Sequence, residues 1–236
     1  MKSMVSVCLI TYNGEKYISE QLQSIIAQLS DNDEIIVSDD GSTDNTLNII
    51  KNFNDKRIKI IPHEPFKNPT FNMEVALSHA QGEYIFMSDQ DDVWLPNKVK
   101  VMVDALQTAD YVISDCYVTD ENLNIIYHTR YVPELKIHKN KFLALFFTTP
   151  YQGSCVAFRK KVLEKALPFP KYIQSHDRWV GNIAAFFYRV KFIPEKLIYY
   201  RRHSNNTSQF KSPNPIFKRI YYRLGYCWGL LTRIFK

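Results

Sequence analysis

The stretch Tyr84-Ile85-Phe86-Met87-Ser88-Asp89-Gln90-Asp91-Asp92 runs from an apolar segment directly into an acidic turn. The apolar part has the composition of a buried β-strand, and the three carboxylates after it repel one another unless positive charge lies among them. Hard divalent cations such as Mg²⁺ and Mn²⁺ prefer oxygen ligands and commonly bridge to substrate phosphates. A solvated turn with a helix cap needs only one aspartate. The stretch therefore predicts an enzyme that handles a nucleotide diphosphate.

Strand-like and helix-like segments alternate on both sides of this stretch. We expect strands at 5–10, 34–38, 58–61, 84–87 and 111–114, and helices at 18–29, 47–53, 70–80 and 99–106. Such alternation with short turns predicts an α/β fold, in which a mostly parallel, Rossmann-like sheet is flanked by helices on both faces.

Three polar turns follow strands of the expected sheet, at 11–14, 39–42 and 89–92. In parallel α/β sheets, ligands bind beyond the carboxyl ends of the strands. Because all three turns fall at that edge, we expect them to converge in space although they are distant in sequence.

The second half of the chain is less regular. We expect a helix at 139–147, a strand at 155–158, a helix at 177–188, a strand at 197–201 and a linker at 212–215. The expected organisation is one domain over 1–210, with a nucleotide-binding half at 1–115 and an acceptor-binding half at 116–210. A basic amphipathic tail at 211–236 follows it.

The 236 residues, 45% of them hydrophobic, suit one globular domain with an appendage. The formal net charge of +6 lies outside the body, since residues 1–210 contain equal numbers of basic and acidic side chains. The excess falls on Lys211, Lys218, Arg219, Arg223, Arg233 and Lys236. This distribution indicates an anionic surface contacted by the tail and argues against a nucleic-acid groove across the body.

Apolar residues recur at helical spacing through the tail, at Phe217, Ile220, Tyr221, Leu224, Trp228, Leu231 and Phe235. A basic amphipathic helix with Trp at its apolar margin is typical of interfacial membrane elements. We expect peripheral membrane contact through residues 216–236. The alternative is an ordinary helix packed on the body.

Other features bear on location. No apolar run approaches the roughly 20 residues needed to cross a bilayer. Met1-Lys2-Ser3 leads at once into a strand, without the apolar core of a signal peptide. The four scattered cysteines form no CxxC pair, so zinc and redox motifs find no support. We expect a cytoplasmic protein, peripheral at the inner face of the cell membrane.

Three polar residues each have two interpretations. Asp40 is well placed to accept hydrogen bonds from a base or a ribose, but aspartates in such turns also cap helices. Asp177 could be a general base with Trp179 as an aromatic platform, or it could cap the helix that follows. His203 could complete a metal shell, although a lone histidine is more often structural.

Taken together, the turns resemble those of family 2 glycosyltransferases, which have the GT-A fold, and most closely the bacterial rhamnosyltransferase-like enzymes among them. The resemblance covers about residues 4–208 and leaves the tail outside. It rests on the segments 5–14, 39–44, 82–85, 88–94, 175–179 and 200–206.

The resemblance implies a role for each matching position. The donor-binding residues would be Thr11, Tyr12, Asn13, Asp39, Asp40 and Asp89. Asp89 and Asp91 match the ends of the family's DxD motif and would hold Mg²⁺ or Mn²⁺ together with His203. Asp177 matches the catalytic base of these inverting enzymes. Trp94 and Trp179 would contact the acceptor.

The expected activity is metal-dependent transfer of a sugar from a UDP- or dTDP-linked donor to a hydroxyl of a glycan or lipid-linked acceptor. The setting would be synthesis of a bacterial surface polysaccharide. One alternative is a nucleotidyltransferase that makes the activated sugar, but that class usually needs a Gly-rich, basic phosphate loop near its N-terminus. A second alternative is a binding module that tethers a partner to membranes without catalysis.

Overall fold

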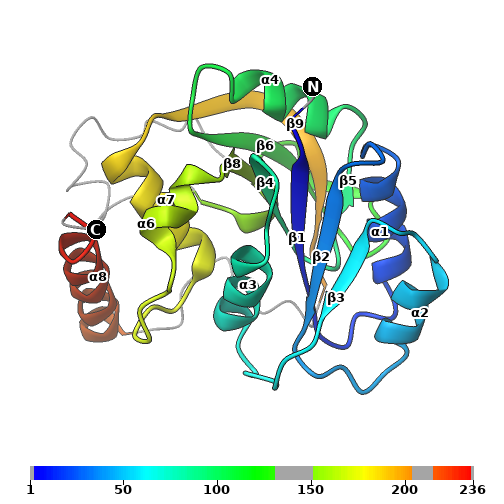
Figure 1. Ribbon diagram of the computed structural model, residues 1–236, viewed down its shortest axis with the longest axis horizontal. Coiled ribbons are helices and arrows are strands. Elements are labelled where there is room, and N and C mark those ends of the chain that lie inside the picture. Colours follow the sequence, from blue (N-terminus) through cyan, green and yellow to red (C-terminus); the bar gives the residue numbers. More distant parts are fainter. Residues whose placement is uncertain (1–2, 131–150, 204–214, 235–236) are drawn as a thin grey trace.

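The computed structural model describes residues 3–130, 151–203 and 215–234 (Figure 1). Its strands are β1 (Val5–Thr11), β2 (Glu34–Asp39), β3 (Ile58–Ile61), β4 (Tyr84–Ser88), β5 (Val93–Trp94), β6 (Tyr111–Thr119), β7 (Ile125–Tyr127), β8 (Val156–Arg159) and β9 (Val190–Arg201). Its helices are α1 (Ile18–Ile26), α2 (Thr46–Asn52), α3 (Pro69–Ser78), α4 (Lys98–Ala105), α6 (Lys161–Ala166), α7 (His176–Phe187) and α8 (Ile216–Leu231), with a 3₁₀ turn, η1 (Gly153–Cys155).

One mixed sheet forms the centre of the molecule, in the order β3-β2-β1-β4-β8-β6-β9-β5, with β7 beside β6. The strands β3, β2, β1 and β4 are parallel, as the alternating pattern predicts. β8 then enters antiparallel between β4 and β6, and β5 pairs antiparallel with β9. The strands β6 and β9 form a further parallel pair. The α/β class is therefore confirmed, and the antiparallel pairs are those that involve β8, β5 and β7.

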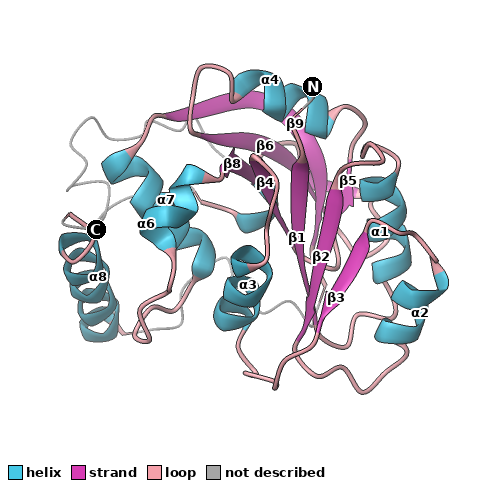
Figure 2. Cartoon of the chain, in the orientation of Figure 1, coloured by secondary structure: helices cyan, strands magenta, loops and turns pink. Residues whose placement is uncertain are grey.

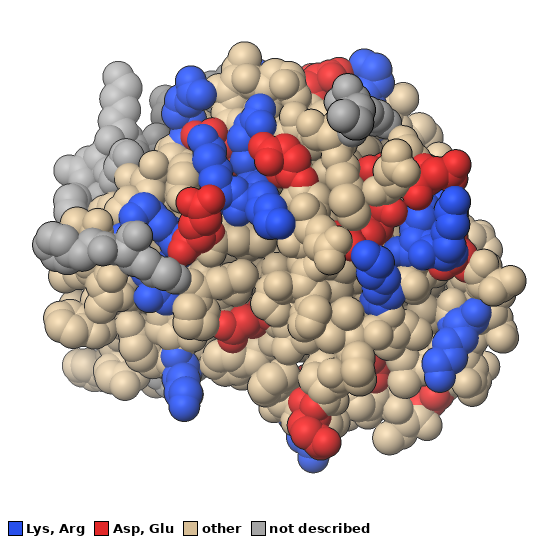
Figure 3. All heavy atoms as spheres, viewed as in Figure 1, with Lys and Arg blue, Asp and Glu red and all other residues tan. Residues whose placement is uncertain are grey.

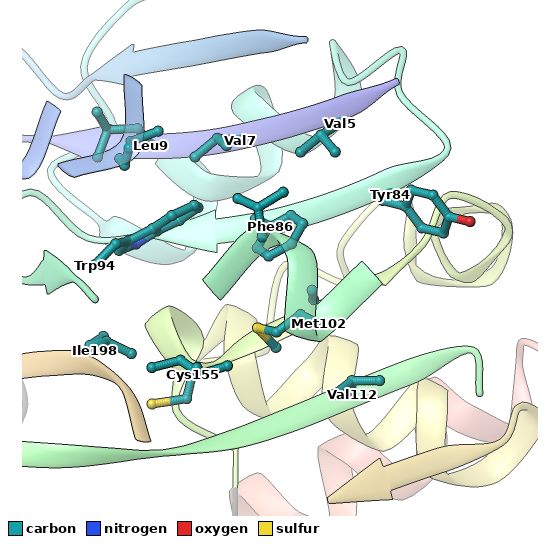
Figure 4. Packing of buried hydrophobic residues seen from close by; sticks show 14 of the residues in the cluster. Val5, Val7, Leu9, Tyr84, Phe86, Trp94, Met102, Val112, Cys155 and Ile198 are labelled. Atoms are coloured by element: carbon teal, nitrogen blue, oxygen red, sulfur yellow. The ribbon is translucent and has the colours of Figure 1, made fainter. Parts of the chain in front are cut away.

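Helices cover both faces of this sheet and enclose two hydrophobic cores (Figure 2). Successive residues of β4 alternate between them: Phe86 packs with α1 and α4 in one core, and Ile85 packs with α3 and α7 in the other. Figure 4 shows the first core, where Phe86 lies beside Trp94 and the side chains of β1. This two-sided burial explains why the central strands are continuous apolar runs.

The strands and helices expected before residue 115 are present within a few residues of their predicted bounds. In the second half, β8, α7 and β9 correspond to three of the expected elements, although β9 begins at Val190, seven residues before the predicted start. The expected helix at 139–147 lies outside the described residues, and so does most of the linker at 212–215. The sequence pattern missed β5, β7 and α6, which are short.

Helix α8 packs on the body along one face only. Tyr226 and Leu230 are buried in the second core, and Gly229 lies so close to Trp179 that a Cβ there would be 2.8 Å from the indole ring. The opposite side exposes the large apolar side chains of Phe217, Ile220, Tyr221, Leu224, Trp228 and Leu231. In the described part of the chain, no helix is both long and apolar enough to span a membrane.

Candidate active site

The three polar turns meet at the carboxyl edge of the parallel strands, as expected. Thr11 at the end of β1 is in register with Asp39 at the end of β2, and its hydroxyl donates to Asp39 Oδ2 at 2.6 Å. The Gln90 side chain bonds both backbone groups of Tyr12, at 2.8 and 2.9 Å. Gly14 leaves room for this link, since a Cβ there would lie 2.3 Å from Gln90 Oε1.

The turn after β2 uses its carboxylates to hold backbone. Asp39 accepts from the N–H groups of Gly41 and Ser42 and from the Ser42 hydroxyl. Asp40 is buried and accepts from three successive N–H groups of residues 66–68, at 2.6 to 2.9 Å. These two side chains therefore fasten the first turn and the segment before α3. Their contact with a donor stays a prediction.

Asn13, the third residue of the first turn, also makes hydrogen bonds to the turn after β2. Its backbone has a left-handed φ of 47°, its N–H donates to Ser42 Oγ, and its side-chain oxygen accepts from Thr43 N. Tyr12 beside it is 52% exposed. Tyr12 is therefore accessible to a ligand at this edge, whereas Asn13 joins the two turns.

The turn after β4 brings together carboxylates that repel one another. Burial and the neighbouring Asp91 raise the pKa of Asp89 to about 6. Asp92 is completely buried, and burial together with Asp91 and Asp89 raises its pKa well above the ordinary range. One of its oxygens accepts from Arg201 N at 3.1 Å, whereas the other makes no hydrogen bond within 3.5 Å to any residue that the structure describes. A bound cation would reduce the electrostatic repulsion among these carboxylates.

His203 and Asp91, which are distant in sequence, lie side by side. The His203 Nε2 atom is 2.8 Å from Asp91 Oδ2, and the two side chains are 10% and 15% exposed, respectively. The Tyr17 ring stacks on the His203 ring with 4.8 Å between centroids. Arg201, at the end of β9, donates to the Asp91 carbonyl and to Glu20. Residue types alone gave no signal for Tyr17 or Arg201, because their partners are distant in the chain.

Asp177 lies in the first turn of α7, close to the acidic turn. Ser175 is the N-cap of this helix. Asp177 Oδ1 accepts from Arg178 N and from the Ser175 hydroxyl, and its carboxylate interacts electrostatically with Asp89. Gly153 packs against this turn, since a Cβ there would lie 3.7 Å from Asp177 Cβ. The structure thus places the predicted base within electrostatic range of Asp89, one of the predicted metal-binding carboxylates.

Neither tryptophan offers a surface to an acceptor in this structure. Trp179 is completely buried, and its indole N–H donates to the Ala166 carbonyl at 2.8 Å. Trp94 is 3% exposed, packs on Phe86, and borders a surface hollow whose lining includes none of the carboxylates. The structure therefore does not support acceptor contact by these two residues. Their apolar surroundings provide the physical reason, because a large aromatic ring gains most by joining a core.

The metal-binding side chains of this turn suit a hard divalent cation that also takes ligands from substrate phosphates. They do not form a complete site by themselves. Within the residues that the structure describes, no three His, Cys, Asp or Glu side chains come together as a complete metal site. Mg²⁺ and Mn²⁺ sites commonly use one or two carboxylates and take the remaining ligands from phosphate and water. Asp89, Asp91 and Asp92 supply carboxylate oxygens of this kind.

A mixed α/β sheet with an acidic turn at the carboxyl edge of its parallel strands, and with His203 bonded to that turn, is the arrangement expected of a GT-A fold. The family model described as "Glycosyl transferase family 2" matches residues 6–167. The chain belongs to this family, and the GT-A fold expected from the sequence is confirmed.

Individual relatives agree with this assignment. The dTDP-rhamnosyl transferase RfbG of Shigella flexneri is 31% identical over 92% of this chain and 78% of its own length. The Escherichia coli protein named UDP-Glc:alpha-D-GlcNAc-diphosphoundecaprenol beta-1,3-glucosyltransferase WfgD is 30% identical over 59% of this chain and 55% of its own length. The solved mannosyltransferase PcManGT of Pyrobaculum calidifontis, in complex with GDP-Man and Mn²⁺, has a TM-score of 0.64 at 19% identity, covering 99% of this chain and 74% of that chain. Against the first curated relatives, the chain spans about two thirds of their length, 66% and 67%.

Proposed function

We propose that this protein is an inverting glycosyltransferase that moves a sugar from a UDP- or dTDP-linked donor to a hydroxyl of a glycan or lipid-linked acceptor. The observation that carries the proposal is the acidic turn 89–92, where His203 contacts Asp91 and the Asp177 carboxylate acts electrostatically on Asp89. The names of the relatives RfbG and WfgD support a sugar nucleotide as donor, and that of WfgD supports a lipid-linked acceptor. The setting would be synthesis of a bacterial surface polysaccharide.

Asp89, Asp91 and His203 would hold Mg²⁺ or Mn²⁺ against the donor diphosphate. When bound, the metal would stabilise the negative charge that develops on the departing nucleotide. Tyr12, Thr11 and the turn after β2 would line the nucleotide pocket. The raised pKa of Asp89 supports this arrangement, because a site that holds excess negative charge gains most from a cation.

Asp177 would be the general base. In a single displacement at the anomeric carbon, it would take the proton of the acceptor hydroxyl while the bond between the sugar and the diphosphate breaks. Its Oδ1 is held by Arg178 N and Ser175, so the carboxylate has a fixed orientation at the start of α7. General-base catalysis is typically worth ~10²–10⁴-fold, so Asp177→Asn should lower kcat by that factor and leave donor affinity unchanged. A variant that loses affinity and rate equally would contradict this role.

The proposal is tested by nucleotide release from a panel of UDP-, dTDP- and GDP-sugars, with and without Mn²⁺. We expect metal-dependent release from at least one donor and faster release when a lipid-linked saccharide is added. Absence of metal-dependent release from every donor would favour a membrane-tethering module without catalysis. Release of pyrophosphate from a nucleoside triphosphate and a sugar phosphate would favour a nucleotidyltransferase instead.

The exposed face of α8 supports peripheral contact with an anionic bilayer at the inner face of the cell membrane. Phe217 and Trp228 on this face are 81% and 62% exposed, and the chain's whole positive excess lies after residue 210. On the face of the molecule drawn in Figure 3, basic and acidic side chains are interspersed. Apolar side chains would enter the headgroup region while the basic residues meet anionic lipid. One face of the helix would thus serve packing and the other would serve the membrane.

Vesicle flotation with phosphatidylglycerol membranes tests this contact. Trp228→Glu should weaken binding strongly, and Ile126→Glu is a matched control because Ile126 is exposed to 49% and belongs to β7 rather than to α8. High salt should weaken the binding of the wild type as well. Equal binding by both variants and the wild type would rule out α8 as the contact.

A further inference from the structure

A completely buried lysine lies under the acidic turn. Lys98 is the first residue of α4, and its ammonium donates to the Ser154 carbonyl and lies 4.4 Å from the centroid of the Trp94 ring. An isolated ammonium is expensive to bury. Burial lowers the pKa of Lys98 to about 8, and the Ser154 carbonyl, the Trp94 ring and the electrostatic attraction of Asp92 and Asp89 offset part of the cost.

The turn η1 joins this lysine to the acidic turn. Ser154 is also completely buried, and while its carbonyl accepts from Lys98, its hydroxyl donates to Asp89 Oδ2 at 3.0 Å. A hydrogen bond to one carboxylate oxygen fixes the rotation of the carboxyl group. Ser154 therefore determines which way Asp89 presents its other oxygen.

The residue before Ser154 reaches the other side of the site. A Cβ on Gly153 would lie 3.2 Å from His176 Nε2 and 3.7 Å from Asp177 Cβ, so the backbone of η1 packs directly on the first turn of α7. One short turn of three residues thus touches the carboxylate at the end of β4 and the helix start that carries Asp177.

We propose that Lys98 and Ser154 are positioning residues that hold Asp89 and the first turn of α7 as one unit. Lys98 fixes the backbone of η1 from inside the protein, and Ser154 orients the Asp89 carboxylate toward the metal and the diphosphate. Neither side chain touches substrate. The proposal rests on the proposed function, because it assigns Asp89 to the metal-diphosphate site.

Mn²⁺ affinity in the presence of UDP or dTDP, followed by electron paramagnetic resonance, tests the proposal without requiring turnover. Removing a hydrogen bond that orients a metal ligand typically costs 10–100-fold in metal affinity. We expect Ser154→Ala to weaken Mn²⁺ binding about 10-fold, with a melting temperature near that of the wild type. Ser114→Ala is the matched control, since Ser114 is equally buried and donates to the next carbonyl of η1, that of Cys155, without a hydrogen bond to Asp89.

Lys98→Met should weaken Mn²⁺ binding at least as much as Ser154→Ala, and Ser154→Ala alone decides the question if the lysine variant does not fold. Unchanged affinity in Ser154→Ala would overturn the positioning role and leave the proposed function intact. Equal losses in Ser154→Ala and Ser114→Ala would also overturn it, because the cause would then be general loosening of η1. Absence of Mn²⁺ binding by the wild type with both nucleotides would overturn the proposed function and the positioning role with it.

Discussion

Two acidic turns lie on either side of the first turn of the chain, and they are built in opposite ways. In the turn after β2, every carboxylate oxygen of Asp39 and Asp40 accepts a hydrogen bond from the protein. In the turn after β4, one oxygen of Asp92 makes no hydrogen bond to the described part of the chain, and Asp89 has a raised pKa. Aspartates at the same edge of one sheet therefore have different surroundings in the two turns.

The difference separates scaffold from site. A carboxylate that accepts several N–H groups stabilises the fold whether or not a ligand is present. Carboxylates that face one another destabilise the fold until a cation arrives, and such conflict concentrates at functional sites. Substitutions in the turn after β2 should therefore change the free energy of unfolding, and substitutions in the turn after β4 should change metal-dependent activity.

Asp91→Asn should produce the largest effect. A catalytic metal is worth several kcal/mol of transition-state stabilisation, so weakening its site should lower kcat/KM by ~10²–10³-fold. Stability should change little, because the amide oxygen of asparagine can still accept the hydrogen bond from His203. The measurement is donor consumption against Mn²⁺ concentration. Full activity of Asp91→Asn at ordinary Mn²⁺ concentrations would end the assignment of this turn as the metal site.

Asp40→Asn should act on stability instead. The amide cannot accept the three backbone N–H groups of residues 66–68 as a carboxylate does, and hydrogen bonds to charged groups contribute about 1.5–3 kcal/mol each. We expect the free energy of unfolding to fall by about 2–4 kcal/mol, measured by urea denaturation. The Mn²⁺ dependence of the remaining activity should match that of the wild type. A variant as stable as the wild type would show that the contrast between the two turns is wrong.

The sequence predicted the convergence of these turns but not the contrast between them. Apolar runs ending in polar turns indicate strand ends at one edge, and this information is local. The partners of Asp40 lie 26 to 28 residues away, and Ser154 lies 65 residues from Asp89, so residue types gave no sign of either contact. Lys98 was also missed, because a lysine at the start of a helix is ordinarily solvated.

The rest of the fold shows the same limit. The strand at 155–158 was expected from its composition, yet nothing in its local pattern indicates that β8 inserts antiparallel between β4 and β6. For Trp179, the sequence did indicate burial, but the residue was predicted to contact the acceptor. It begins an apolar helical face that continues through Val180, Ile183 and Ala184, and that face is buried. Helical spacing favoured core over acceptor contact.

Asp89→Asn should stabilise the protein in the absence of divalent metal. Because the pKa of Asp89 is raised from the ordinary value of 3.8 to about 6, the fold favours the protonated form. Its contribution to stability is therefore complete below about pH 4 and is lost as pH rises through 6. In EDTA at pH 8, we expect the variant to exceed the wild type by about 1–3 kcal/mol in free energy of unfolding, with no difference near pH 4. The measurement is the melting temperature of Asp89→Asn and of the wild type as a function of pH. A difference between the two proteins that stays constant from pH 4 to pH 8 would contradict the prediction.

Ser42→Ala should produce the smallest effect and tests the scaffold turn at its edge. The variant loses the 2.6 Å hydrogen bond from Ser42 Oγ to Asp39 Oδ2, while Thr11 still donates to the same oxygen. We expect a loss of about 1 kcal/mol in free energy of unfolding, typical of one hydrogen bond, and no change in the response to Mn²⁺. The same hydroxyl accepts from Asn13 N, which joins this turn to the first. A changed Mn²⁺ dependence in Ser42→Ala would therefore mean that the two acidic turns are coupled through residues 11–14, and that scaffold and site are not separate.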